Sequence, residues 1–216
     1  LRLAAALAGD ENLIKDFSDP TVDIHTKTAA DVYGVDPADV SPIQRRHAKV
    51  INFGVLYGMS PHGLSEATGM SFADAKTFIQ KYFQLRAPIR DFLDKTIKQA
   101  REQGFVETLF GRRRLTPDVK SGNFMIRASA ERAAANMPIQ GTEADIVKMA
   151  MLQIDRELKN VAPQIMQVHD SIMVECDPAA AAEIGAKMKN IMENIYPELG
   201  VVLRADVKIG GSWGDV

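Results

Sequence analysis

The chain has 216 residues, of which 46% are hydrophobic and 25% are charged, and its formal net charge at pH 7 is −2. This is the composition of a globular chain, so disorder, collagen and coiled coil are excluded as descriptions of the whole. The single cysteine, Cys176, excludes an internal disulfide framework and a cysteine zinc site. The small net charge provides no overall basic field, so a nucleic-acid partner would have to be held by local clusters.

Helix signals dominate the first 120 residues. The opening run 1–8 is too short for a membrane span or a signal peptide and is typical of the start of a buried helix. Ser41, Pro42 and Gln44 suit the cap, first and third positions of a helix that we expect to end at Gly58. The other elements predicted here are helices over 23–33, 71–83 and 88–104, and a hairpin of strands 105–109 and 114–116.

The last third of the chain changes character. A helix predicted over 123–136 is expected to stop at Pro138, and another is predicted over 143–158. The remaining predicted elements are strands at 165–168 and 172–174, a helix at 178–195 and a final strand at 201–209. The pattern therefore predicts an α+β fold, helical to about residue 120 and then containing a small antiparallel sheet.

One face of the predicted helix 42–57 carries a row of residues suited to a nucleoside triphosphate. Arg45, Lys49 and Phe53 recur every four residues with Tyr57 beside them, and the row spans about 18 Å. Arginine and lysine bind phosphate oxygens, and aromatic rings offer a flat apolar surface to a base or sugar. The other interpretation is an amphipathic helix with a solvated basic edge and two core aromatics. The residues expected to pack on the opposite face are Ile43, Val50 and Gly54.

A second candidate site is the turn between the two strands predicted at 165–168 and 172–174. Asp170 would be held rigidly there at the edge of the sheet, where its carboxylate could bind a hard cation such as Mg²⁺. Ordinary turn chemistry explains Asp170 and Ser171 equally well, and His169 alone is more typical of a hydrogen-bonded turn residue than of a metal ligand.

Two polar patterns suit contact with a nucleic acid. Arg132, Asn136 and Gln140 form a row that could lie along a nucleic-acid backbone or minor groove, or could be a solvent-facing polar edge. Between Lys98 and Arg132 there are eight cationic and four anionic residues, a local excess that suits phosphate contacts or a solvated surface.

These patterns occur together in an order that resembles family A DNA polymerases, the bacterial DNA polymerase I type. The matching segments are Arg45-x-x-x-Lys49-x-x-x-Phe53-Gly54-x-x-Tyr57-Gly58, Val168-His169-Asp170, Asp23-Ile24-His25-x-x-Thr28-Ala29, Glu107-Thr108-Leu109-x-Gly111-Arg112-Arg113 and Glu131-Arg132-Ala133-x-x-x-x-Pro138-x-Gln140-Gly141-Thr142. The first of these is similar to the family's second polymerase motif and Val168-His169-Asp170 to its third. The resemblance covers nearly the whole chain.

The resemblance implies part of a right-hand polymerase: a palm remnant over residues 1–9, a fingers subdomain over 10–120 and a palm over 121–216. It implies transfer of a nucleotide from a deoxynucleoside triphosphate to the 3′ hydroxyl of a primer on a DNA template, in replication or repair. The implied cofactor is Mg²⁺ at a two-metal site. The implied protein is a cytoplasmic, nucleoid-associated monomer of the bacterial type without a membrane partner.

The resemblance also assigns roles to individual residues. The implied nucleotide-binding residues are His25, Arg45, Lys49, Phe53 and Tyr57. The implied contacts with primer-template DNA come from Arg132, Asn136, Gln140 and His169. The implied catalytic residues are Asp170, Lys49 and Arg45, and Asp170 is the implied metal ligand.

Two departures from the family pattern affect these expectations. The family's first motif, which carries the second metal-binding aspartate, would end just before Leu1, so we expect the chain as given to be inactive alone. Most DNA polymerase I sequences have glutamate at the position of Ser171, and Glu175 does not replace it by motif.

Two other functions remain open at this point. Single-subunit RNA polymerases often carry His-Asp-Ser, as this chain does at residues 169–171, but usually have methionine at the position of Phe53 and lack the Phe53-Gly54 pair. The other alternative is a non-catalytic DNA-binding module derived from a polymerase.

Overall fold

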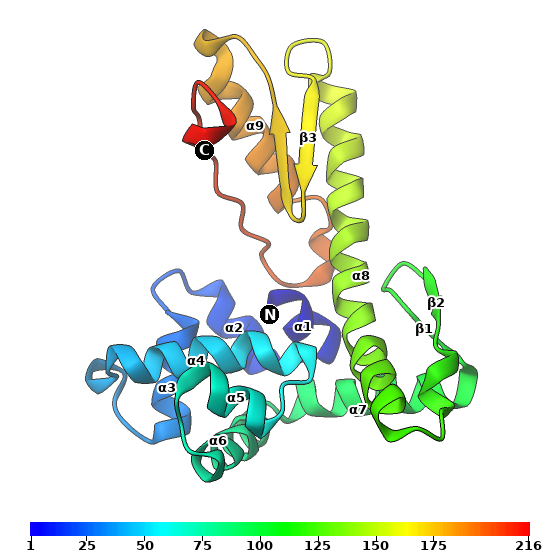
Figure 1. Cartoon of the computed structure of the whole chain (residues 1–216). Helices are drawn as coiled ribbons and strands as arrows, with labels where there is room; N and C mark the ends of the chain where they lie inside the picture. The colour runs from blue at the N-terminus through cyan, green and yellow to red at the C-terminus, as the bar shows by residue number, and fades with distance from the viewer. The chain divides into compact units, whose positions relative to one another are not determined.

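The computed structural model describes residues 1–216 apart from the side chain of Val55 (Figure 1). The chain divides into two compact units, residues 1–140 and residues 141–216. Of the helices described, none is both long enough and apolar enough to cross a lipid bilayer.

The first unit is helical except for one hairpin. Its helices are α1 (Arg2–Ala8), α2 (Glu11–Ser18), α3 (Ile24–Tyr33), α4 (Pro42–Gly54), α5 (Pro61–Thr68), α6 (Phe72–Leu85), α7 (Ala87–Gln103) and the first part of α8 (Phe124–Leu158). Strands β1 (Phe105–Glu107) and β2 (Arg113–Leu115) pair antiparallel, with Val106 opposite Arg114. The hairpin was predicted from the sequence and is confirmed; its first strand is shorter than predicted, and its second begins and ends one residue earlier.

Side-chain caps explain where the predicted helices of this unit begin. Asp23 accepts hydrogen bonds from the first N–H groups of α3, and Ser71 caps α6 in the same way. Ser41 and Gln44 form a reciprocal capping box at the start of α4, with the Ser41 N–H donating to Gln44 Oε1 at 2.9 Å. The helix then tightens into a 3₁₀ turn, Val55–Tyr57, before Gly58. Helices α2 and α5 were not predicted.

The break predicted at Pro138 is wrong, because α8 runs unbroken from Phe124 to Leu158 with Pro138 inside it. Proline removes one helical hydrogen bond, a cost of about 3 kcal/mol in a helix interior. Packing outweighs this cost: Ala134 and Met137 are buried in a cluster with Ala100 and Val106, and Ile139 is also buried.

The second unit combines the rest of α8 with a hairpin and a helix. Strands β3 (Gln164–Val168) and β4 (Ser171–Val174) pair antiparallel, with Val168 opposite Ser171, and α9 spans Ala181–Glu193. Its core contains Ile154, Leu158, Ala162, Ile184 and Ile191, with Ile172 and Val174 of the sheet packed against them. The predicted α+β class is confirmed.

The final strand predicted at 201–209 is wrong, because this extended segment joins neither described sheet. Its polar and apolar groups contact α9 instead. The Ala205 N–H donates to Glu193 Oε1 at 3.0 Å, and Val207 lies so close to Gly185 that a Cβ there would meet its Cγ1 at 2.7 Å. These contacts take the place of a strand partner.

The chain ends in a short 3₁₀ turn, Trp213–Asp215, which holds its only tryptophan. Ser212 Oγ donates to Asp215 Oδ2 at 2.8 Å across this turn, and Trp213 is 64% exposed.

Candidate active site

The predicted row on α4 is an exposed stripe. Arg45 and Lys49 are exposed, and Phe53 and Tyr57 are 49% and 55% exposed. Large aromatic side chains at this exposure are available to a ligand. The interpretation of Phe53 and Tyr57 as core residues is therefore wrong.

The opposite face of α4 differs in part from the prediction. Gly54 is buried as predicted and Val50 is half-buried, but Ile43 is 66% exposed. The buried face is centred on Ala48 and Ile51, and at 3.6 residues per turn Ile43 lies roughly 80° around the helix from Ile51. Ile43 therefore falls outside the buried stripe.

An ion pair joins Arg45 to the N-terminus of α3. Arg45 donates through Nη2 and Nε to Asp23 Oδ2, at 2.6 and 3.0 Å, and the two side chains are 46% and 43% exposed. Burial raises the pKa of Asp23, but hydrogen bonds from the Thr26 and His25 N–H groups and from Arg45 outweigh it and hold this pKa below its ordinary value. Asp23 thus stays ionised and fixes the direction of Arg45.

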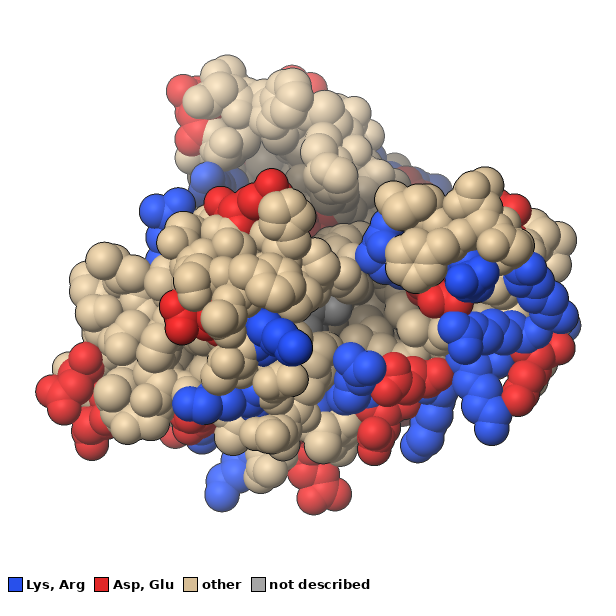
Figure 2. All heavy atoms as spheres, turned by 60° about the horizontal axis from the view of Figure 1, so that its bottom comes forward, with Lys and Arg blue, Asp and Glu red and all other residues tan. Residues whose placement is uncertain are grey.

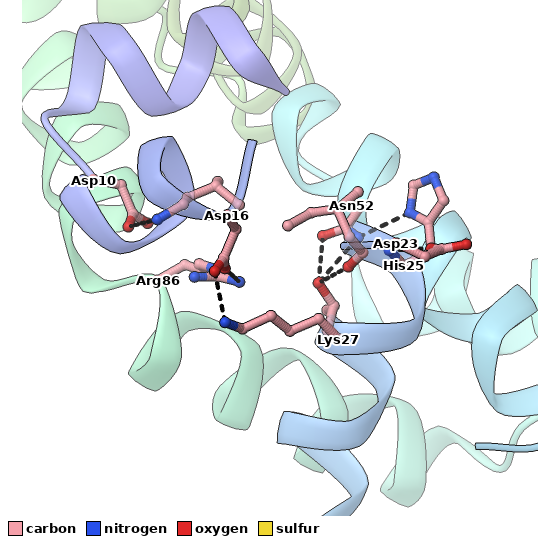
Figure 3. Close-up of polar contacts among 10 residues, drawn as sticks. Asp10, Asp16, Asp23, His25, Lys27, Asn52 and Arg86 are labelled. Atoms are coloured by element: carbon pink, nitrogen blue, oxygen red, sulfur yellow. Dashed lines mark hydrogen bonds and ion pairs between the residues drawn. The ribbon is translucent and has the colours of Figure 1, made fainter. Parts of the chain in front are cut away.

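His25 lies at the same end of α3, beside the stripe. Its ring centroid is 5.9 Å from that of Phe53, and its Nδ1 is 3.1 Å from Asn52 Nδ2 (Figure 3). Burial lowers the pKa of His25; Asp23 opposes that effect, and the positive charges of Arg45 and Lys49 reinforce it. His25 is therefore a neutral hydrogen-bonding group next to two cations.

The polar row predicted at Arg132, Asn136 and Gln140 meets the end of the stripe. Gln140 Nε2 donates to the Tyr57 hydroxyl at 3.0 Å, and Asn136 Nδ2 donates to the Leu56 carbonyl at 2.8 Å. Arg132 lies against Gly58: a Cβ added at Gly58 would be 2.7 Å from the Cγ of Arg132.

The three members of this row differ in exposure. Arg132 and Gln140 are exposed, whereas Asn136 is 8% exposed and its amide nitrogen is held by Leu56. The interpretation of the whole row as a solvent-facing edge is therefore wrong for Asn136. No sequence pattern indicates the contact with Leu56, because the partner is a backbone carbonyl 80 residues away.

In the second unit, the candidate residues His169 and Asp170 form the tight turn between β3 and β4. His169 has a φ of 52°, an uncommon conformation for a residue other than glycine, and the Ser171 hydroxyl donates to the Val168 carbonyl at 2.8 Å across the turn. His169, Asp170 and Ser171 are all exposed. Asp170 therefore presents its carboxylate at the end of the hairpin, as predicted.

Glu143 of α8 is a second acid of this unit that the sequence reasoning missed. Burial raises the pKa of Glu143, and the negative charge of Asp170 raises it further. A charge 27 residues away gives no sequence pattern by which Glu143 could have been found. Its half-buried carboxyl is a second oxygen donor that interacts with Asp170.

The donor chemistry of this turn fits Mg²⁺ but does not form a complete protein cage. Among the residues that the structure describes, no group of three or more His, Cys, Asp or Glu side chains could hold a metal ion. Mg²⁺ commonly uses one or two carboxylates together with water and substrate phosphates. Asp170, with Glu143 near enough to affect it electrostatically, meets that smaller requirement.

A basic surface covers the hairpin of the first unit. Figure 2 shows Lys and Arg side chains gathered at the right of the view, on the side where β1 and β2 lie in Figure 1. Arg112, Arg113 and Arg114 are exposed. Arg113 donates to Glu107 at 3.1 Å and stacks 4.3 Å from the centre of the Phe105 ring.

Known proteins are similar to this chain over nearly its whole length. The model of the family described as DNA polymerase family A matches residues 1–215. The chain is 47% identical over 214 residues to the thermostable DNA polymerase I of Thermus filiformis, covering 99% of this chain and 26% of that protein. It is 45% identical over 217 residues to DNA polymerase I of Streptococcus pneumoniae, covering 99% of this chain and 24% of that protein.

A solved structure is similar over most of the chain. The POL domain of Pol1 from M. smegmatis, in complex with a DNA primer-template and a dNTP, matches with a TM-score of 0.85 and 36% identity. The match covers 94% of this chain and 36% of that one. The chain spans about a quarter of the length of the two curated relatives. The resemblance predicted from the motifs is confirmed, and the chain belongs to DNA polymerase family A.

Proposed function

We propose that this chain forms the nucleotide-binding fingers, over residues 10–120, and most of the palm, over residues 121–216, of a template-directed DNA polymerase. The observation that carries the proposal is the exposed stripe of Arg45, Lys49 and Phe53 on α4 and Tyr57 in the 3₁₀ turn that follows, with His25 beside it. Two cations, a neutral donor and two aromatic rings match the phosphates, sugar and base of a deoxynucleoside triphosphate. The similar structure from M. smegmatis contains a primer-template and a dNTP, which supports the same ligands here.

In this proposal Arg45, Lys49 and His25 bind the triphosphate. Asp23 holds Arg45 in place before the nucleotide arrives, so less side-chain freedom is lost on binding. Lys49 is the compact cation that offsets negative charge as it develops on the phosphates. Phosphoryl transfer depends mainly on such positioning and charge stabilisation, because the protein itself forms no covalent bond.

The aromatic residues and the polar row then locate the growing end of the DNA. Phe53 and Tyr57 lie against the sugar and base, and Gln140 holds the Tyr57 hydroxyl at 3.0 Å. Arg132 and His169 contact the primer-template. Asn136 acts from the interior, by holding the Leu56 carbonyl next to Tyr57.

Asp170 is the proposed Mg²⁺ ligand, together with the substrate phosphates and with Glu143 as a nearby second carboxylate. Of the two ions of such a site, one would lower the pKa of the attacking primer hydroxyl and the other would stabilise the leaving oxygens. Glu143 offers an acid in the same unit although Ser171 replaces the family's usual glutamate. The protein acts as a monomer in replication or repair.

A chimera tests the proposal directly. Residues 1–216 would replace the matching segment of DNA polymerase I from Thermus filiformis, and extension of a labelled DNA primer would be measured with deoxynucleotides and ribonucleotides in parallel. We expect template-directed extension with deoxynucleotides, and its loss in Asp170→Ala. Asp155→Ala, which removes an exposed acid of α8, is the matched control and should keep activity.

The other outcomes favour the alternatives. A preference for ribonucleotides would assign the chain to RNA synthesis. Binding of primer-template without extension by either substrate would favour a non-catalytic DNA-binding module. Equal activity in Asp170→Ala and in the unaltered chimera would contradict the proposed metal ligand.

A further inference from the structure

Asn52 is a buried polar residue on α4 that none of the sequence motifs uses. It is 1% exposed and lies between Lys49 and Phe53 in the sequence, on the face turned toward α3. Its amide contacts two residues of α3, Thr28 and His25 (Figure 3). A buried amide needs hydrogen-bond partners, so the question is which of its atoms faces which neighbour.

Thr28 settles the orientation of the Asn52 amide. The Thr28 hydroxyl has one proton, and it donates that proton to the Ile24 carbonyl at 2.7 Å, because the other acceptor, Asn52 Oδ1, is 3.5 Å away. Thr28 Oγ1 can therefore only accept from Asn52, and Asn52 Nδ2 lies 3.2 Å from it. Rotating the amide would place its carbonyl oxygen against an oxygen with no proton to offer, and both groups are buried.

The second hydrogen of the same amide nitrogen faces His25. Asn52 Nδ2 lies 3.1 Å from His25 Nδ1, and an amide nitrogen can donate but not accept. His25 Nδ1 must therefore carry a lone pair, and the proton of the neutral ring must be on Nε2. That nitrogen points away from Asn52 (Figure 3).

We propose that Asn52 is a positioning residue that holds His25 as its Nε2–H tautomer, so that Nε2–H is the group offered to a phosphate oxygen of the nucleotide. The proposal rests on the proposed nucleotide site. The phosphate oxygens of a nucleoside triphosphate only accept, so a ring with its Nε2 proton fixed suits them and the opposite tautomer does not. The ring binds as a donor without adding a third charge beside Arg45 and Lys49.

The tautomer can be read directly by NMR on the 216-residue chain. Long-range ¹H–¹⁵N correlations distinguish protonated from unprotonated ring nitrogens, and His25→Gln identifies the signal among the four histidines. We expect an unprotonated Nδ1 and a protonated Nε2 in the unaltered chain. Asn52→Leu should give a mixture of tautomers, and Asn52→Asp, whose carboxylate accepts, should select Nδ1–H.

Two substitutions at Thr28 distinguish an effect of the Asn52 amide on the His25 tautomer from a general loss of structure. Thr28→Ser keeps the hydroxyl, so the His25 tautomer should be unchanged. Thr28→Val keeps the shape but frees the Asn52 amide to rotate, so Nδ1–H should appear. A protonated Nδ1 in the unaltered chain, or an unchanged tautomer in a folded Asn52→Leu variant, would overturn the proposal.

The functional arm uses the same chimera with Thermus filiformis DNA polymerase I, and dTTP is the probe. Asn52→Leu should raise KM for dTTP by about tenfold, the equivalent of one hydrogen bond, with a smaller change in kcat. Thr28→Ser should keep KM unchanged, and an unchanged KM in Asn52→Leu would overturn the positioning role. If the unaltered chimera does not use dTTP, the proposed function fails, whereas the NMR result tests the tautomer independently.

Discussion

At Gly58 the backbone has a φ of +67°, and the Arg132 side chain packs where a Cβ would be. Both facts restrict this position to glycine, because other residues pay a cost in the left-handed region. We expect Gly58→Ala to lower the free energy of unfolding by about 1–2 kcal/mol, the usual cost of that conformation. Urea unfolding followed by circular dichroism measures the change.

Gly122→Ala is the matched control for this substitution. A methyl group at Gly122 would meet no atom within 4 Å, and the residue has no positive φ, so its substitution should leave stability nearly unchanged. An equal loss in the two variants would show that the effect is not specific to the conformation of Gly58.

A second prediction at this scale concerns His25 and pH. Burial lowers the pKa of His25 from 6.5, and Arg45 and Lys49 lower it further against the opposing charge of Asp23. The unfolded chain then binds the proton more readily, so stability should fall as pH decreases from 6.5 through the folded pKa. His25→Gln should show a smaller loss between about pH 8 and about pH 5.5 in urea unfolding.

Some pH dependence should remain in His25→Gln, because burial also lowers the pKa of His47. Identical pH profiles for His25→Gln and the unaltered chain would contradict the prediction. His47→Gln gives the complementary comparison.

Individual site residues differ in how far the sequence could predict them. Arg45, Lys49 and Phe53 share one exposed face of α4 because helical spacing alone determines which residues of a helix share a face. The orientation of the Asn136 amide depends on a backbone carbonyl from another helix, which no spacing encodes. The roles implied for these residues by the family resemblance remain predictions.

Among the elements, the starts of the capped helices could be predicted from the sequence. The continuation of α8 through Pro138 and the conformation of segment 201–209 could not. Local hydrogen bonds at Asp23, Ser41 and Ser71 determine where three helices begin, and these depend on adjacent residues. Pro138 and segment 201–209 instead depend on partners far away in the sequence. Their structures follow from packing that a single sequence does not reveal.

Helices α2, α3 and α7 are linked by a buried charge at Asp16, which is 8% exposed. Lys27 Nζ of α3 donates to Asp16 Oδ1 at 2.6 Å. Arg86, the residue before α7, is 4% exposed, and its Nη2 lies 3.8 Å from Asp16 Oδ2 (Figure 3). Asp16→Asn would leave Arg86 buried without its counter-charge, and we expect stability to fall by about 3–5 kcal/mol. Thermal and urea unfolding measure this loss.

The control for this change is Asp91→Asn, which neutralises an exposed acid of α7 and should have little effect. Removing both buried charges in Asp16→Asn/Arg86→Met should restore part of the stability, because no buried charge is then left unpaired. A double variant less stable than Asp16→Asn alone would contradict the electrostatic explanation.

On the scale of the whole molecule, each unit has its own hydrophobic core. The α+β class could be predicted, because helix and strand periodicities differ within a few residues. The division into compact units at residues 140 and 141 could not, because it falls inside the continuous helix α8. The predicted boundary between fingers and palm at residue 120 concerns a functional division and remains a prediction.

Because each unit has its own core, a cavity made in one core should destabilise that unit and leave the other nearly unchanged. Ile154 is fully buried in the core of the second unit, so Ile154→Ala should cost about 2–5 kcal/mol there. Amide hydrogen exchange should show lost protection in β3, β4 and α9, with little change in α3 and α4. Leu152→Ala, at an exposed site on the same helix, is the control.

Trp213 determines what ultraviolet fluorescence can report about this chain. Three of the four tyrosines lie in the first unit, but selective excitation of tryptophan excludes their emission and observes only the second unit. Because the indole is already 64% exposed, its emission should shift little when that unit unfolds. A fluorescence melt could therefore look flat while the nucleotide stripe on α4 loses its structure, and a tryptophan introduced at buried Tyr82 would supply the missing optical signal.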